Sequence, residues 1–325
     1  MNLHALDLPD KRGQKKEFTF IKDSSYQGVS GVWRIDSGVP GPIVGITICT
    51  HGNEISGLAA LWYFRHHFLP TEALKCGSVI FVLNDIEAAE QYFKAQTPEE
   101  EKLCRKVDDN MNRLPVDTME RSGNDSYEIR RAQELRPIWE SFDSALDLHS
   151  FTQSGPPPMI VSCFAEWPEL IKSWPIERVI KDIEIVQRNK PACSFYGHNG
   201  KEKRPFIGLE CGSHREKSSL VIAITSTISF LRYLGVVGSL ESELPSYQHR
   251  VFKIIGSVFF LDKTYRVVRS FTDGTEVRKG EVVGRNPEGK EIYSSCDGIT
   301  LFWDKSDTPS DINEEVFFIA ELPQQ

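Results

Sequence analysis

Residues 43–54 have the sequence IVGITICTHGNE, and the organisation of the chain can be worked out from this segment. Its first part, Ile43 to Cys49, is an apolar run rich in β-branched residues, which predicts a buried strand. A polar turn that contains glycine follows at residues 50–54, and apolar residues then recur at helical spacing from Leu58 to Leu69. Strand, turn and helix in this order form the repeating unit of α/β folds, which place their sites at the carboxyl ends of strands.

Strand-like runs and helical periods keep alternating up to about residue 234. The further strands that we predict are Val79–Leu83, Ala145–Leu148 and Phe206–Leu209. The predicted helices are Tyr127–Phe142, in which Pro137 indicates a kink or a break, Glu169–Gln187, and a helix to Leu234 opened by a capping box at residues 213–216. This alternation predicts an α/β domain with a mostly parallel or mixed sheet.

The pattern changes after about Leu244. From Val251 to Ile319 the sequence consists of short β-type runs, which are separated by the turn pairs Asp273-Gly274, Lys279-Gly280, Glu288-Gly289 and Asp297-Gly298. Turns at this density are typical of a small all-β domain. We therefore predict an α/β domain over residues 1–244 and a β-rich domain over residues 245–325, which pack directly against each other.

The composition excludes several classes of protein. The 325 residues include 38 Lys and Arg against 46 Asp and Glu, a net charge of −8, without a dense basic block, so we expect no nucleic-acid partner. No apolar stretch is long enough for a bilayer and no signal-peptide pattern opens the chain, so we expect no membrane partner and a cytoplasmic location. Seven scattered cysteines without a C-x-x-C pair favour reduced thiols over disulfides or a thiolate zinc site.

Two histidines and a carboxylate fall where predicted strands end. His51 and Glu54 lie three residues apart in the polar turn, and His149 ends the third strand. Two imidazoles with one carboxylate form the donor set of hydrolytic zinc sites. Taken singly, each signal is weak, because a lone histidine is more often a hydrogen-bonded core residue. Asp147 fits either a carboxylate that orients a ligand or a turn contact.

Other polar side chains at strand ends indicate a reaction. Glu210 ends an apolar strand, and a glutamate in such a place needs a partner or a task, such as that of a general base. Asn112 and Arg113 combine an amide with a guanidinium that can bind a carboxylate bidentately. Arg105 precedes them by a few residues. Surface salt bridges are the alternative for both arginines, and for Arg105 alone they are favoured.

At these residues the sequence resembles the succinylglutamate desuccinylase/aspartoacylase family within the zinc carboxypeptidase superfamily. The matching motifs occur in the family's order over most of the first 215 residues: Thr50–Glu54 through Gly57, Asn112-Arg113, Tyr127–Glu134, Asp147–His149 and Gly208–Gly212. The resemblance implies an α/β fold with a zinc-carboxypeptidase-like mixed sheet flanked by helices. It also implies that the smaller C-terminal all-β domain packs over the active-site entrance.

The resemblance assigns roles to the candidate residues. His51, Glu54 and His149 would hold one Zn²⁺ per chain, and Glu210 would be the general base. The residues implied for the substrate are Arg105, which would polarise the scissile carbonyl, Asn112 and Arg113, which would bind the substrate carboxylate, and Tyr196, near the position of a substrate-contacting tyrosine. The implied activity is that of a zinc-dependent amidohydrolase, a deacylase that cleaves a small N-acyl amino acid.

Departures from the family limit the choice of substrate. The family's Asn-Pro turn is replaced by Asn84-Asp85, and the arginine that grips aspartate in true aspartoacylases has no clear counterpart before Glu210. We therefore name neither acetylaspartate nor succinylglutamate. Two alternatives stay open, a zinc carboxypeptidase that acts on peptides and a non-catalytic binding protein that retains the fold. The sequence leaves homo-oligomerisation open as well.

Overall fold

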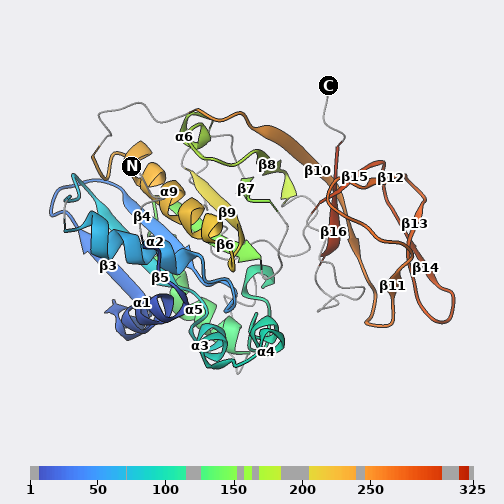
Figure 1. The fold of residues 1–325 in the computed structure, drawn as a ribbon, viewed down its shortest axis with the longest axis horizontal. Coiled ribbons are helices and arrows are strands. Elements are labelled where there is room, and N and C mark those ends of the chain that lie inside the picture. Colours follow the sequence, from blue (N-terminus) through green and yellow to red (C-terminus); the bar gives the residue numbers. More distant parts are fainter. Residues whose placement is uncertain are drawn as a thin grey trace.

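The fold is described from a computed structural model, which places residues 7–70, 72–114, 126–151, 157–162, 168–183, 205–238, 246–301 and 315–321. Figure 1 shows an α/β part with a β-rich part beside it. The helices are α1 (Lys11–Asp23), α2 (Gly57–Tyr63), its continuation η2 (Phe64–Phe68), α3 (Ile86–Lys94), α4 (Pro98–Leu103), η3 (Met111–Arg113), α5 (Tyr127–Glu140), α6 (Pro168–Ile171) and α9 (Lys217–Tyr233).

The strands of the α/β part form the centre of the molecule. They are β3 (Val32–Asp36), β4 (Ile43–Ile48), β5 (Ser78–Leu83), β6 (Ser144–Phe151), β7 (Met159–Ser162), β8 (Arg178–Lys181) and β9 (Phe206–Ser213), preceded by a small hairpin of β1 (Ser25–Tyr26) and β2 (Val29–Ser30). β4 lies parallel to β5 and β6, and β6 lies parallel to β9. These are the four strands predicted from the sequence, and their carboxyl ends meet at one edge.

The β-rich part contains β10 (Arg250–Phe259), β11 (Arg266–Val267), β12 (Glu276–Val277), β13 (Val282–Arg285), β14 (Glu291–Tyr293), β15 (Gly298–Leu301) and β16 (Glu315–Ala320). β10 is shared between both parts. Its first four residues pair in parallel with β8, and Ile254 to Phe259 pair antiparallel with β16. One eleven-stranded mixed sheet therefore runs β12-β15-β16-β10-β8-β7-β9-β6-β4-β5-β3. The predicted boundary at residue 244 lies outside the described residues.

Helices cover both faces of the central sheet. Along β5, Val79, Phe81 and Leu83 pack in a core with α1, α2 and α9, whereas Ile80 and Val82 pack in a second core with α5. This alternation is the two-residue period of a strand whose two faces are both buried. The predicted α/β class, with a mixed sheet flanked by helices and small antiparallel sheets at the C-terminus, is confirmed. In the described part of the chain, no helix has the length and hydropathy to cross a membrane.

Two local predictions were wrong. The helix expected over Glu169–Gln187 is not continuous: α6 ends at Ile171, and Arg178 to Lys181 form β8 instead, because β7 and β10 offer hydrogen-bonding partners on both sides. The capping box does not form: Ser213 still belongs to β9, and α9 begins at Lys217 without a side-chain cap. The predicted helix at Tyr127 does form, and it continues through Pro137. Helix α1 was not predicted.

Candidate metal centre and active site

The turn after β4 brings His51 and Glu54 to the same place. Cys49 has a φ of 51°, a left-handed conformation that turns the chain sharply at the end of the strand. Gly52 packs so closely on α3 that a Cβ atom there would lie 2.2 Å from the carbonyl carbon of Ala88. The backbone N–H of Glu54 donates to the carbonyl oxygen of His51 at 3.0 Å, which closes the turn. Glycine is therefore required for the close approach that sets this loop.

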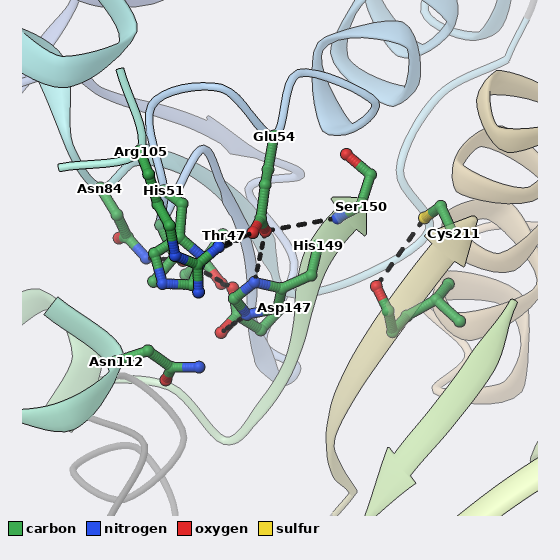
Figure 2. Close-up of polar contacts among 12 residues, drawn as sticks. Thr47, His51, Glu54, Asn84, Arg105, Asn112, Asp147, His149, Ser150 and Cys211 are labelled. Carbon is green, nitrogen blue, oxygen red and sulfur yellow. Dashed lines mark hydrogen bonds and ion pairs between the residues drawn. The ribbon is translucent and has the colours of Figure 1, made fainter. Parts of the chain in front are cut away.

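Three candidate metal ligands converge in Figure 2. His51 Nδ1 lies 2.7 Å from Glu54 Oε1, and His149 Nδ1 lies 2.8 Å from Glu54 Oε2. One ligand atom from each residue lies within 4.8 Å of the other two, and all three residues are buried. The structure thus brings together the set that the sequence predicted, from the β4–α2 turn and from β6.

The outer nitrogens of both imidazoles have their own acceptors. His51 Nε2 lies 2.9 Å from Asn110 Oδ1, an oxygen that also accepts from a backbone N–H, and His149 Nε2 lies 2.9 Å from Asp147 Oδ2. Each Nε2 therefore carries a hydrogen, and in the neutral ring the lone pair is on Nδ1. Two lone pairs then point at the Glu54 carboxylate, an arrangement that requires either extra protons or a cation. The donor set fits zinc, with outer partners that orient both rings.

Asp147 is itself fixed by hydroxyl groups. Thr47 Oγ1 donates to Asp147 Oδ1 at 2.6 Å and Thr50 Oγ1 donates to the same oxygen at 3.0 Å, while Asn84 Nδ2 donates to Thr50 Oγ1 at 2.8 Å. These contacts leave the other Asp147 oxygen for His149. Asp147 therefore orients His149, a candidate ligand, which matches one of the two roles considered from the sequence.

Burial and charge act in opposite directions on the titratable groups of the centre. Burial alone would raise the pKa of Glu54, but the two histidines outweigh it and hold that pKa well below its usual range. Burial together with the Arg105 charge lowers the pKa of His51. Burial would also lower the pKa of His149, yet the carboxylates of Asp147 and Glu54 raise it well above the ordinary value. The carboxylates of Glu54 and Asp147 therefore make the site favourable for a positive charge between the two histidines.

Glu210 lies beside this group on the neighbouring strand. Its Cα pairs in register with that of His149, so both side chains lie on the same face of the sheet. Burial raises the pKa of Glu210 to about 7, and its Oε2 has no hydrogen-bond partner within the described residues. A carboxyl group with a pKa near neutrality and a free oxygen is suited to accept and return a proton.

The loop before α5 carries the predicted substrate residues. Arg105 Nη1 donates to Glu54 Oε1 at 2.7 Å, which places the guanidinium at the candidate metal ligands. Asn112 extends toward the histidines in Figure 2, and its Oδ1 is buried without a partner within the described segments. Arg113 instead forms an ion pair at 3.0 Å with Glu315 of β16. Tyr196 lies outside the described residues.

Glu128 holds this loop, and the sequence assigned it no role. The side chain is fully buried and accepts hydrogen bonds from the backbone N–H groups of Val107 at 2.6 Å, Asp108 at 3.1 and 3.2 Å, and Asp109 at 2.9 Å. In return, Asp108 Oδ2 accepts from the N–H of Tyr127 and caps α5. The motif that contains Glu128 was visible in the sequence, but its long-range partners were not.

One protein-family model matches a large part of the chain. The sequence model described as the succinylglutamate desuccinylase/aspartoacylase catalytic domain matches residues 40–224, more than half of the chain. This span contains every candidate site residue that the sequence predicted, from His51 to Glu210. No curated protein is a significant sequence match.

Solved structures share the fold at low sequence identity. Succinylglutamate desuccinylase from Vibrio cholerae is 14% identical with a TM-score of 0.65, covering 94% of each chain. Succinylglutamate desuccinylase/aspartoacylase from Rhodobacter sphaeroides is 16% identical with a TM-score of 0.59, covering 90% of this chain and 89% of that one. The product-bound ectoine utilization protein EutE (DoeB) from Ruegeria pomeroyi is 16% identical with a TM-score of 0.58, covering 90% and 88%. These likenesses cover the β-rich part as well.

Proposed function

Because the chain belongs to the succinylglutamate desuccinylase/aspartoacylase family, whose members are hydrolytic deacylases, we propose that it is a zinc-dependent hydrolase that cleaves the amide bond of a small N-acyl amino acid. The observation that carries the proposal is the convergence of two imidazole Nδ1 atoms on the Glu54 carboxylate, with Glu210 on the adjacent strand. A binding protein would have no need for a proton acceptor beside a metal site.

His51, Glu54 and His149 would hold the metal. When bound, Zn²⁺ supplies Lewis acidity toward the scissile carbonyl and lowers the pKa of coordinated water. Asn110 and Asp147 keep the two imidazoles in the tautomer whose Nδ1 atoms face inward. Their role is to fix the donor geometry before the metal binds, so that little reorganisation is needed.

The remaining residues would act on water and substrate. Glu210 takes the proton from the attacking water and then returns it to the leaving amine, for which its raised pKa is suited. Arg105 contacts Glu54 in this structure; with a cation balancing that carboxylate, its guanidinium can stabilise the negative charge that develops on the carbonyl oxygen. Asn112 and Arg113 bind the substrate carboxylate, and the β-rich part narrows the entrance so that small substrates are favoured.

The proposal is tested by metal analysis and a substrate panel. Purified protein supplied with zinc should contain one Zn²⁺ per chain, and His149→Ala should lose it. The panel contains N-acyl amino acids with different acyl groups together with short unblocked peptides. Release of amine from the acyl amino acids alone supports the deacylase, release of C-terminal residues from the peptides would favour a carboxypeptidase, and zinc binding without any turnover would favour a binding protein.

A further inference from the structure

Arg113 and Glu315 join two parts of the chain that lie 202 residues apart in sequence. Arg113 ends η3, next to Asn112, and Glu315 is the first residue of β16. Arg113 Nε donates to Glu315 Oε2 at 3.0 Å, and the two side chains are 17% and 3% exposed. Removal of one partner of so buried a pair would leave an uncompensated charge, so each side chain holds the other in place.

Among the residues that the structure describes, the contacts of Arg113 leave one end of its guanidinium unused. Nε donates to Glu315, and Nη1 donates to the carbonyl oxygen of Asn112 at 2.8 Å. A guanidinium has five N–H groups in a rigid planar arrangement, and within the described segments these two contacts engage two of them. The N–H groups that are left lie on Nη1 and Nη2, the pair of nitrogens that can bind a carboxylate bidentately.

We propose that Glu315 is a positioning residue for substrate recognition, which fixes the Arg113 guanidinium so that its Nη1 and Nη2 groups face the carboxylate of an N-acyl amino acid. This inference rests on the proposed function and adds the β-rich part to the substrate site. Glu315 lies beyond residues 40–224, the span that matches the family's catalytic domain. The catalytic domain alone therefore lacks a residue on which its substrate affinity depends.

The opposite role for Glu315 would be that of a competitor that neutralises Arg113 and weakens substrate binding. The two roles predict opposite signs when the carboxylate is removed. The geometry favours positioning, because Glu315 contacts Arg113 through one oxygen only and leaves the Nη1–Nη2 end free. Its second oxygen, Oε1, is buried with no hydrogen-bond partner among the described residues, so it does not occupy the substrate side of the guanidinium.

The test compares substrates with and without a carboxylate. Glu315→Ala and Glu315→Gln are assayed as full-length, zinc-loaded proteins on the best N-acetyl-L-amino acid of a panel and on its carboxamide. We expect KM for the acid to rise about 10- to 100-fold in the alanine variant and less in the glutamine variant, which keeps an acceptor for Nε, with kcat nearly unchanged. KM for the carboxamide should stay at the wild-type value in both variants.

Asp273→Asn provides a matched control. Asp273 belongs to the β-rich part and pairs with Arg178 of β8 at 2.9 Å, so it forms the same kind of contact. Arg178 lies three strands from His149 in the sheet, roughly 14 Å at the usual strand spacing. Loss of this carboxylate should leave KM for both substrates unchanged, which separates a general effect on domain packing from an effect on Arg113.

A binding measurement separates failure of the inference from failure of the proposed function. In a Glu210→Gln background loaded with zinc, the dissociation constant of the N-acetyl amino acid is measured by calorimetry with and without Glu315→Ala. A rise of at least tenfold supports the inference even if the wild type has no turnover. An unchanged or lower dissociation constant, no binding of any N-acetyl amino acid, or an equal loss for acid and carboxamide would overturn it.

Discussion

Replacement of Glu128 by alanine should both destabilise the protein and weaken its metal site. The variant removes a buried carboxylate that accepts hydrogen bonds from three consecutive backbone N–H groups at residues 107–109. Hydrogen bonds to charged groups contribute about 1.5–3 kcal/mol each to stability. In the variant, water can accept hydrogen bonds from some of the freed N–H groups, which recovers part of this free energy. Asp108 and Asp109 are exposed and can be rehydrated, whereas the N–H of Val107 is less accessible. We expect the free energy of unfolding to fall by about 3–5 kcal/mol.

The same change should reach the metal through the loop that Glu128 holds. This loop carries Asn110, whose oxygen accepts from His51 Nε2, and Arg105, which contacts Glu54. Loss of an outer partner of a ligand typically lowers metal affinity by about 10- to 100-fold. Chelator competition would measure the zinc dissociation constant, and guanidinium unfolding of the metal-free protein would measure stability.

Glu134→Ala is the matched control for this prediction. Glu134 lies on the same helix, but its side chain is 62% exposed; its partner Arg131 is 3% exposed and also donates to the backbone carbonyl oxygens of Ser30, Leu83 and Asn84. Because Arg131 keeps these backbone acceptors and the Glu134 carboxylate is largely hydrated, loss of the pair should cost about 0–1 kcal/mol, and this variant should unfold and bind zinc nearly as the wild type does. If Glu128→Ala unfolded within 1 kcal/mol of the wild type and kept its zinc affinity, the role assigned to Glu128 would be wrong.

Four further variants test other residues at and near the site. Glu210→Gln should retain zinc while kcat falls by about 10²–10⁴-fold, whereas Glu54→Gln should weaken zinc binding itself; loss of zinc from the Glu210 variant would contradict the assignment. Gly52→Ala should lower zinc affinity in chelator competition, because its Cβ would lie 2.2 Å from the backbone of Ala88, and unchanged affinity would count against the loop geometry. Burial raises the pKa of Asp85 from 3.8 to about 8, so the native state binds an extra proton between these values and loses stability as the pH rises toward 8. When unfolding is measured at pH 5, 7 and 9, the free energy of unfolding of Asp85→Asn should increase relative to that of the wild type by at most roughly 1.4 kcal/mol per pH unit up to pH 8. Above pH 8 this difference should stay constant, and a pH-independent difference over the whole range would refute the pKa shift.

The sequence was most informative where local pattern and burial coincide. Ile43 to Cys49 could be predicted as a strand because β-branched residues bury well on both faces of a parallel sheet. His51, Glu54 and His149 could be predicted as a set because they follow such strands, and parallel strands bring their carboxyl ends to one edge. Residues 178–181 could not be predicted as a strand from the sequence, since their strand conformation depends on hydrogen-bonding partners in β7 and β10.

Residues that act through distant contacts left no signal of their own. Glu128 looks like any acidic residue in the first turn of a helix, yet its carboxylate binds a loop about twenty residues earlier in the chain. Glu315 is one of several acids before an apolar run, and its partner is 202 residues away. Only the folded chain shows that both carboxylates support the residues predicted to bind substrate and metal.

The shared strand β10 limits how this protein can move and how it can be recombined. Hinged opening needs a few loop residues that absorb large changes in φ and ψ, but here a continuous strand hydrogen-bonds to β8 at one end and to β16 at the other. Rotation of the β-rich part as a rigid body would break the ladder, so we expect substrate to enter without such a rotation. For the same reason, a chimera that exchanges the C-terminal part between relatives needs its junction before Arg250, so that β10 is transferred whole. The transferred β10 then has to pair with the β8 strand of the other protein.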